Sequence, residues 1–232
     1  MKAIKVSLAI AIFAITTSTI KAQVSVGVKG GASLTKTMGN GFIQNYTGQL
    51  NYIVSGNGAV YLEMPIAGNL SFRPEIGYTQ TGAGASLETS FNITGVDMPI
   101  GGTIRQRLTY LQAAPMLKYE FGNEESAVKP YIILGPTLNY MVDAKLVTRA
   151  DLIIFRSQPY RIDLPLGTFN QFQVGGAGGL GLSFDLGNSK VFIEGRYERG
   201  FTRVYDVPVL RVPVHNQSFS FMAGFSIPLG KI

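Results

Sequence analysis

Few residues of this chain have the types that catalysis or cofactor binding needs. His215 is the single histidine, and the sequence holds no cysteine, which excludes disulfide bonds, thiol nucleophiles and thiolate metal sites. A lipid-modifying enzyme would use a histidine together with a serine and an acid, but no spacing around His215 supports such a set. One histidine is also too few for a typical transition-metal site. We therefore predict a protein that is not an enzyme and holds no cofactor and no metal.

A glycine-rich run, GAGGLG at residues 176–181, matches the pattern G-x-G-x-x-G of dinucleotide-binding turns. That reading requires a helix directly after the glycines. The next residues, LSFDLGN, instead continue an alternating pattern and then enter a turn. Glycine inside a strand more often makes room for a bulky neighbour or eases curvature, so we predict a strand here and no nucleotide site.

The remaining candidates are charged side chains that alternate with apolar ones. In NLSFRPEIGYT, residues 69–79, Arg73 and Glu75 lie on one face of an extended strand, and Leu70, Phe72 and Ile76 lie on the other. The same alternation recurs along the chain and places both signs of charge on one set of faces. We predict that these residues form a charge network in the lumen of a barrel: Lys29, Glu63, Arg73, Glu75, Lys118, Glu120, Asp185, Glu194, Arg196 and Glu198.

Eight segments carry this period of two, and the connections between them alternate in length. The predicted strands are 24–34, 58–66, 69–79, 110–121, 130–143, 171–186, 191–198 and 217–229. Short turns lie at 67–69, 122–127 and 187–189, and long loops at about 35–57, 80–107, 144–168 and 200–216. An even number of antiparallel strands with short turns on one side and long loops on the other is typical of outer-membrane barrels.

The apolar rows could face a core, as in a secreted soluble calycin-like barrel, or face lipid. Charged residues make up only 15% of the chain, and the mean hydropathy is +0.19, whereas soluble domains have roughly 25% charged residues. The rows are almost free of charge and carry Tyr and Phe near their ends, as interfacial aromatic girdles require. We predict an all-β fold: an eight-stranded antiparallel up-and-down transmembrane β-barrel with a plugged polar interior.

The first 22 residues have the pattern of a secretory signal peptide. Lys2 and Lys5 precede an apolar run from Val6 to Ile15, and Ala22 ends a polar segment. We therefore expect 1–22 to be a signal peptide and 23–232 to be the barrel domain. Removing the three lysines of this segment lowers the formal net charge from +6 to +3. No dense Lys/Arg cluster with interleaved aromatics remains, so nucleic acid is not an expected partner.

The turn at 67–69 also predicts a register for the hairpin around it. A three-residue connection pairs Ile66 with Leu70 and Met64 with Phe72, and it places Glu63 opposite Arg73. A slip by one residue would place every apolar side chain opposite a polar one. We therefore expect Glu63 and Arg73 to form an ion pair in the lumen.

Several longer segments resemble the PorT-like outer-membrane β-barrel domain family, whose members are often labelled porin-family proteins and are small OmpA/OmpX-type barrels. The similarity rests on VYLEMPIAGNLSFRPEIGYTQTGA, YLQAAPMLKYEF, KPYIILGPTLNYM, GGLGLSF and VFIEGRYERGFTRV, and above all on Arg196, Tyr197 and Gly200 in the last of these. One departure is the C-terminus, PLGKI, where such barrels usually end on an aromatic residue. The resemblance implies an outer-membrane location and no common activity.

We expect export to the outer membrane of a Gram-negative bacterium and a monomer, with function in the long loops through surface binding, adhesion or an envelope- or secretion-associated role. Expected partners are the barrel assembly machinery, outer-membrane lipids and lipopolysaccharide. Arg149, Arg156 and Arg161, beside LIIF in the third long loop, are the candidate binding residues for an anionic ligand. The alternatives are the secreted calycin-like ligand-binding barrel and an outer-membrane lipid-modifying enzyme that uses His215.

Overall fold

The structure is a computed structural model. It describes residues 23–38, 52–93, 96–123, 126–152, 155–156, 160–165, 170–187, 189–202 and 215–229. The predicted signal peptide lies outside these residues. Within them, the strands are β1 (Ser25–Met38), β2 (Ile53–Ala67), β3 (Leu70–Ile93), β4 (Val96–Glu120), β5 (Val128–Leu152), β6 (Phe155–Arg156), β7 (Tyr160–Asp163), β8 (Phe172–Leu186), β9 (Ser189–Gly200) and β10 (His215–Pro228). No described helix is long and apolar enough to cross a membrane.

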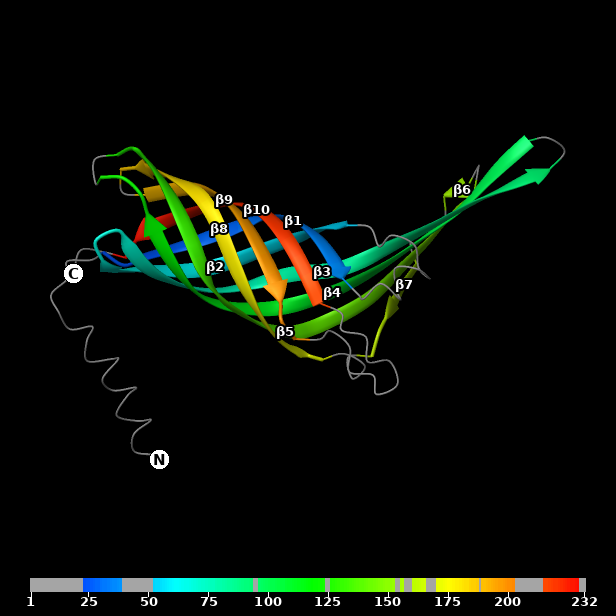
Figure 1. Cartoon of the computed structure of the whole chain (residues 1–232), viewed down its shortest axis with the longest axis horizontal. Helices are drawn as coiled ribbons and strands as arrows, with labels where there is room; N and C mark the ends of the chain where they lie inside the picture. Colours follow the sequence, from blue (N-terminus) through cyan, green and yellow to red (C-terminus); the bar gives the residue numbers. More distant parts are fainter. Residues whose placement is uncertain are drawn as a thin grey trace, which may run out of the picture.

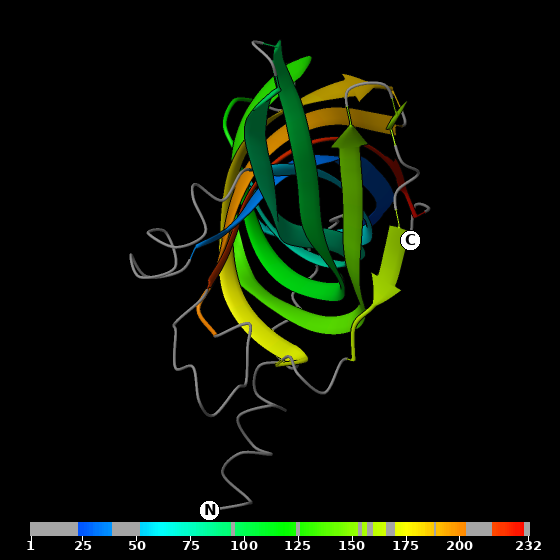
Figure 2. The same ribbon diagram turned by 90° about the vertical axis from the view of Figure 1, so that its right-hand side faces the viewer.

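Eight of the described strands close into an antiparallel barrel, which confirms the predicted fold. Each long strand pairs with its neighbour in the chain, in the order β1, β2, β3, β4, β5, β8, β9, β10, and β10 pairs with β1 to complete the ring. The ring is visible end-on in Figure 2, and Figure 1 shows the three short turns together at one end of the barrel. The up-and-down order follows from these tight turns between neighbouring strands.

The outer wall of the barrel is apolar. Large hydrophobic side chains such as Ile76, Leu134, Leu180 and Phe221 have 60–69% of their surface exposed. The charged residues of the same strands, including Arg73, Glu75 and Glu194, are buried. A soluble calycin-like barrel would have the opposite arrangement, and an exposed apolar surface of this extent belongs against lipid.

The three strands β3, β4 and β5 are much longer than predicted, with 24, 25 and 25 residues. Residues 80–107 were expected to form a loop, but they pair continuously from Gln80 with Thr109 to Ile93 with Val96. The predicted loop at 144–168 likewise begins with the end of β5 and contains β6 and β7. The prediction was wrong here because the alternation changes phase at Gly82 and Gly84. The apolar residues stand at even positions up to Tyr78 and at odd positions from Ala83 to Ile93, and such a change of phase resembles the end of a strand.

The register of the β2–β3 hairpin follows the prediction in its interior and departs from it at the turn. Met64 pairs with Phe72, as predicted, but Ala67 rather than Ile66 pairs with Leu70. The pairing shifts between Pro65 and Ala67, because a β-bulge adds one residue to the β2 side. The turn then closes through Gly68, whose φ of +51° favours glycine.

Prolines inside the apolar rows sit where the ladder tolerates them. Pro74 and Pro115 are cross-strand partners of each other in β3 and β4. On their other sides, no paired residues are assigned for positions 62 and 63 of β2 or for positions 135–137 of β5 opposite β4. The missing proline N–H groups therefore coincide with interruptions in the ladders, and the two prolines are compatible with a closed sheet.

Three interior aromatic rings each lie over a glycine of the neighbouring strand. Tyr61 pairs with Gly27, Tyr131 with Gly181, and Phe192 with Gly224. A Cβ atom added to any of these glycines would collide with the ring opposite. Gly181 belongs to the GAGGLG run, so that glycine makes room for Tyr131 in the lumen.

We predict that Gly181→Ala destabilises the barrel by about 1–3 kcal/mol, because the added methyl group must displace the Tyr131 ring in a packed interior. The measurement is the urea midpoint of the folded, heat-modifiable band on a gel. Gly56→Ala is the matched control, because a Cβ at Gly56 would meet no atom within 4 Å. Equal midpoints for the two variants would contradict the prediction.

Candidate functional site: the ion cluster in the barrel

Five buried charged residues meet in the middle of the lumen. They are Lys29 of β1, Arg73 and Glu75 of β3, and Glu194 and Arg196 of β9, and at most 4% of any of their side chains is exposed. Alternation within each strand points all five inward, because residues 73 and 75, and likewise 194 and 196, share a face. We call these five residues the ion cluster.

The strongest contact of the ion cluster crosses the barrel from one wall to the other. Arg196 donates from Nη1 to Oε2 of Glu75 at 2.7 Å and from Nη2 to Oε1 at 3.0 Å. This fork geometry is the strong form of an arginine–carboxylate bond. Strands β3 and β9 lie four positions apart in the ring of eight, so the pair joins opposite walls.

The remaining members complete the ion cluster around the two carboxylates. Lys29 Nζ lies 2.7 Å from Glu75 Oε2 and 3.5 Å from Glu194 Oε1. Arg73 contacts Glu75 at 3.2 Å and Glu194 at 3.4 Å, and Arg196 Nη2 also lies 2.6 Å from Glu194. Three cations therefore share two carboxylates, and each carboxylate contacts all three.

Arg73 has no exposed surface and is enclosed by aromatic rings as well as carboxylates. Its guanidinium carbon lies 4.0 Å from the ring centre of Tyr61 and 4.7 Å from that of Phe192. Desolvated contacts of this kind between a cation and a ring are attractive. The Tyr131 hydroxyl, beside these rings, donates a hydrogen bond to Glu194 Oε2 at 3.0 Å.

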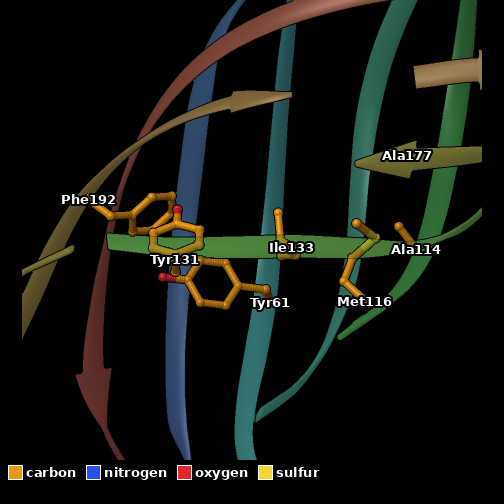
Figure 3. Close-up of a cluster of buried hydrophobic side chains, with 7 residues drawn as sticks. All are labelled: Tyr61, Ala114, Met116, Tyr131, Ile133, Ala177 and Phe192. Atoms are coloured by element: carbon orange, nitrogen blue, oxygen red, sulfur yellow. The ribbon is translucent and has the colours of Figure 1, made fainter. Parts of the chain in front are cut away.

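An apolar cluster packs beside these charges inside the barrel, and the sequence reading did not anticipate it. Figure 3 shows the rings of Tyr61, Tyr131 and Phe192 together, with Ile133, Met116 and Ala114 along the wall. The signal was present in the alternation, because Met116 lies between Gln112 and Lys118 on the inward face of β4. It was missed because the inward faces were read as polar throughout.

A second group of charges lies at the end of the barrel that carries the short turns. Lys118 Nζ contacts Glu63 at 2.9 Å and Glu120 at 2.8 Å. Lys129 and Lys190 both contact Asp185, at 2.9 Å and 3.7 Å, and Lys190 also reaches Glu120 at 3.5 Å. Neither Lys129 nor Lys190 was among the predicted network residues, although Lys129 lies between the apolar Val128 and Pro130.

The expected ion pair between Glu63 and Arg73 does not form as predicted. Glu63 pairs with Lys118 instead, and Arg73 reaches Glu75 and Glu194. The flanking pair Tyr61 with Glu75 does have the predicted register. The partner differs because the rings of Tyr61 and Phe192 hold the Arg73 guanidinium beside the ion cluster, away from the barrel end.

Amide side chains hold the last predicted network residue, Glu198, on the other side of the ion cluster. Gln112 Nε2 donates to both carboxylate oxygens at 2.9 and 3.0 Å, and Asn139 Nδ2 donates at 3.1 Å. Beyond them, Gln173 donates to the Tyr110 hydroxyl at 2.9 Å. The lumen therefore has three layers: amides and Glu198, the ion cluster, and the lysine-rich group.

The predicted binding and catalytic residues lie outside these layers. Arg149 and Arg156 fall in β5 and β6, and their side chains lie outside the described part of the structure. Arg161 is an exposed residue of β7 that pairs with Val147. His215 was expected in a loop, but it is the first residue of β10 and pairs with Met38. Among the described residues, no group of three or more His, Cys, Asp or Glu could hold a metal ion.

Comparison with known proteins gives one family and several distant solved structures. The model of the family "outer membrane protein beta-barrel domain" matches residues 17–206. Neisserial surface protein A has a TM-score of 0.42 at 16% identity, covering 88% of this chain and 97% of its own. OprG of Pseudomonas aeruginosa has a TM-score of 0.39 at 15% identity, with coverage of 90% and 98%.

Ail of Yersinia pestis has a TM-score of 0.35 at 13% identity, covering 88% of this chain and 99% of its own. No curated protein matches the sequence. The family match spans most of the chain, including seven of the eight barrel strands and all three lumen layers. The chain therefore belongs to the outer membrane protein beta-barrel domain family, and it is an outer-membrane protein.

Proposed function

We propose that this protein is an outer-membrane barrel whose lumen is closed by the ion cluster and which binds ligands or surfaces outside the cell through the sheet formed by the ends of β3, β4 and β5. The observation that carries the proposal is the length of these strands. A strand of about 9–11 residues crosses a membrane, whereas these three have 24 or 25. The excess forms a paired sheet beyond the barrel (Figure 1).

The ion cluster supports the closed lumen. Eight strands leave an interior about wide enough for side chains, and here a forked bond between Glu75 and Arg196 crosses that width. The apolar side chains of Tyr61, Phe192 and Met116 fill the lumen beside it. Passage of a hydrated ion would require these contacts to separate inside a low-dielectric wall, which is costly. We propose a scaffold rather than a pore, and no enzymatic activity is part of the proposal.

The paired sheet beyond the barrel, formed by the ends of β3, β4 and β5 and called the extension below, supports the role in binding. Strands β3 and β4 continue from the barrel wall into this sheet in one register, and β5 follows them past a register shift at Thr109 and Tyr110. Sites built on rigid elements are held more precisely than sites on loops. Membership of the PorT-like subgroup, carried by Arg196, Tyr197 and Gly200, is a further part of this proposal.

We predict unequal effects for two substitutions within the ion cluster. Glu75→Gln leaves three cations with one carboxylate and should cost about 3–5 kcal/mol, the usual cost of removing one partner from a buried ion pair. Lys29→Met leaves two cations with two carboxylates and no uncompensated buried charge, so it should cost much less than Glu75→Gln. Because the chain has no tryptophan, urea unfolding is followed by the heat-modifiable gel band. Equal losses of stability in the two variants would contradict the explanation by charge balance.

The orientation is testable because the chain has no cysteine. Arg161→Cys places one thiol on exposed β7, and Lys190→Cys places one among the charges at the short-turn end. We expect a membrane-impermeant maleimide to label Arg161→Cys on intact cells, and to label Lys190→Cys only after the outer membrane is permeabilised. The reverse pattern would place the extension in the periplasm and sink the proposal.

The binding role itself is tested by shortening the extension. Gly82 and Arg107 are cross-strand partners, so replacing residues 83–106 by an Asn-Gly turn closes a hairpin at that point. We expect this variant to keep the heat-modifiable barrel and to lose the adherence of expressing cells to plates coated with matrix protein or polysaccharide. Adherence equal to that of the full-length protein, at equal surface expression, would contradict the proposal.

A further inference from the structure

A small cavity lies in the lumen between the ion cluster and the extension. Its lining includes Thr79 and Thr81, which follow Glu75 on the inward face of β3, and Glu198, which follows Arg196 on the inward face of β9. The other lining residues are uncharged. Its volume of about 20 Å³ is room for about one water-sized group. We call this space the amide cavity.

Glu198 is the one lumen carboxylate that contacts no cation within the described part of the chain. Its hydrogen bonds come from the amide nitrogens of Gln112 and Asn139. Every other lumen carboxylate of the described strands lies 2.6–2.9 Å from a lysine or arginine nitrogen: Glu63, Glu75, Glu120, Asp185 and Glu194. Glu198 therefore has the place of an ion pair whose cation is missing.

One oxygen of Glu198 has room for a further donor. Oε1 accepts hydrogen bonds from Gln112 at 2.9 Å and from Asn139 at 3.1 Å, whereas Oε2 accepts one from Gln112 alone, at 3.0 Å. A carboxylate has about four acceptor sites, so these bonds leave a site on Oε2. A donor in the amide cavity, which Glu198 lines, can use it.

A second oxygen in the wall of the amide cavity has no partner. The hydroxyl oxygen of Thr81 is buried and makes no hydrogen bond to any described residue, and 9% of this residue is exposed. Burying a hydroxyl group without a hydrogen bond costs free energy. A ligand that fills the amide cavity and donates to Thr81 recovers that cost.

The amide nitrogens around the cavity are already engaged. The two amides that hold Glu198 use their nitrogens on it, and the amide nitrogens of Gln173 and Asn216 both donate to the Tyr110 hydroxyl, at 2.9 Å and 3.5 Å. The wall therefore offers mainly oxygen atoms to a ligand. An ammonium group has three donors and no acceptor, so it matches this wall better than an anion does. Calcium requires more carboxylate or carbonyl ligands than one carboxylate supplies.

The ion cluster opposes a cation in the amide cavity, but only weakly. Its three cations and two carboxylates give it a formal charge of +1. Its member on the same strand, Arg196, lies two residues from Glu198, which is roughly 7 Å along the strand. At an effective dielectric constant of about 20, direct attraction at about 3 Å exceeds repulsion at roughly 7 Å by a factor of about two. Arg196 is also bound by Glu75 and Glu194, which weakens its repulsion further.

We propose that the amide cavity binds one primary ammonium group, with Glu198 Oε2 as its charged partner and the Thr81 hydroxyl as a second acceptor. Small free amines and the lysine side chains of polypeptides share this group, and the experiment below separates them. The site goes beyond the proposed function, because it lies in the lumen and requires neither the extension nor a particular orientation in the membrane.

The test follows the side-chain amide signals of Gln112 and Asn139 by NMR while methylammonium chloride is added to the folded protein in uncharged detergent micelles. Sodium chloride keeps the ionic strength constant. The variants are Glu198→Gln and Thr81→Val. Glu63→Gln is the matched control, because it removes a lumen carboxylate at the short-turn end. The heat-modifiable band shows that each variant is folded.

We expect saturable shifts of these signals in the unmodified chain and in Glu63→Gln. Glu198→Gln should weaken binding about 10- to 100-fold, because a hydrogen bond to a charged group is lost, and Thr81→Val should weaken it about two- to tenfold. Equal titrations of the unmodified chain and Glu198→Gln would overturn the proposal. Equal shifts with potassium, or with tetramethylammonium, which has no N–H donor, would overturn it too, since the site would then respond to charge alone.

A short lysine-containing peptide with an acetylated N-terminus, titrated in the same way, separates the two sources of the ammonium group. Saturation by the peptide at a lower concentration than by methylammonium supports a site for a lysine of a polypeptide. Saturation by methylammonium alone supports a site for a small free amine. The absence of shifts with both probes would overturn the proposal and leave the amide cavity to a water molecule.

Discussion

The forked bond between Arg196 and Glu75 is the contact on which the rest of the interior is organised. It joins strands on opposite walls. The other two cations of the ion cluster, Lys29 and Arg73, contact the carboxylates of both Glu75 and Glu194. Such a bond is possible only in a narrow barrel, because the two side chains together must span the lumen. The width of the barrel, the positions of the charges and the packing of Tyr61 and Phe192 against Arg73 therefore depend on one another.

The same strands must satisfy two solvents at once. Their outward residues are apolar because lipid offers no hydrogen bonds, and closure of the ladder removes every backbone edge within the membrane. Their inward residues are then free to be charged, provided that each charge finds a partner. Where the strands leave the barrel, the outward face changes from Tyr140 and Leu111 to Lys145 and Arg107, and this change marks the end of the apolar environment.

Much of this arrangement could be predicted from the sequence, since the period-two alternation together with the rhythm of short and long connections indicated a barrel with its charged residues inside. The charges at Lys29, Glu75 and Arg196 were placed inside on that basis. Their partners could not be predicted, because partner choice across the lumen depends on barrel width, shear and ring positions. Glu63 and Arg73 illustrate this, since they have nearly the right register and yet different partners.

The extension was missed for a different reason. Alternation marks a strand with two unlike faces, but in this segment the apolar positions shift from even numbers up to Tyr78 to odd numbers from Ala83. Residues 80–93 therefore read as a loop, although their backbone is fully paired with β4. Arg105 and Arg107 were not placed on a strand for a related reason, because they pair with Gly84 and Gly82 and lie in the same predicted loop.

The pairing of β1 with β10 has a consequence for how the molecule is assembled. Every other seam joins barrel strands that are successive along the chain, with the short β6 and β7 between β5 and β8. The β1–β10 seam instead joins Ser25 to Pro228 and Met38 to His215. Neighbouring hairpins can form as the chain emerges, whereas the final seam has to wait for the last strand and bear the entropy of the largest loop. Until that pairing forms, β1 and the end of the growing sheet are unpaired edge strands, and the barrel closes only when β10 pairs with β1.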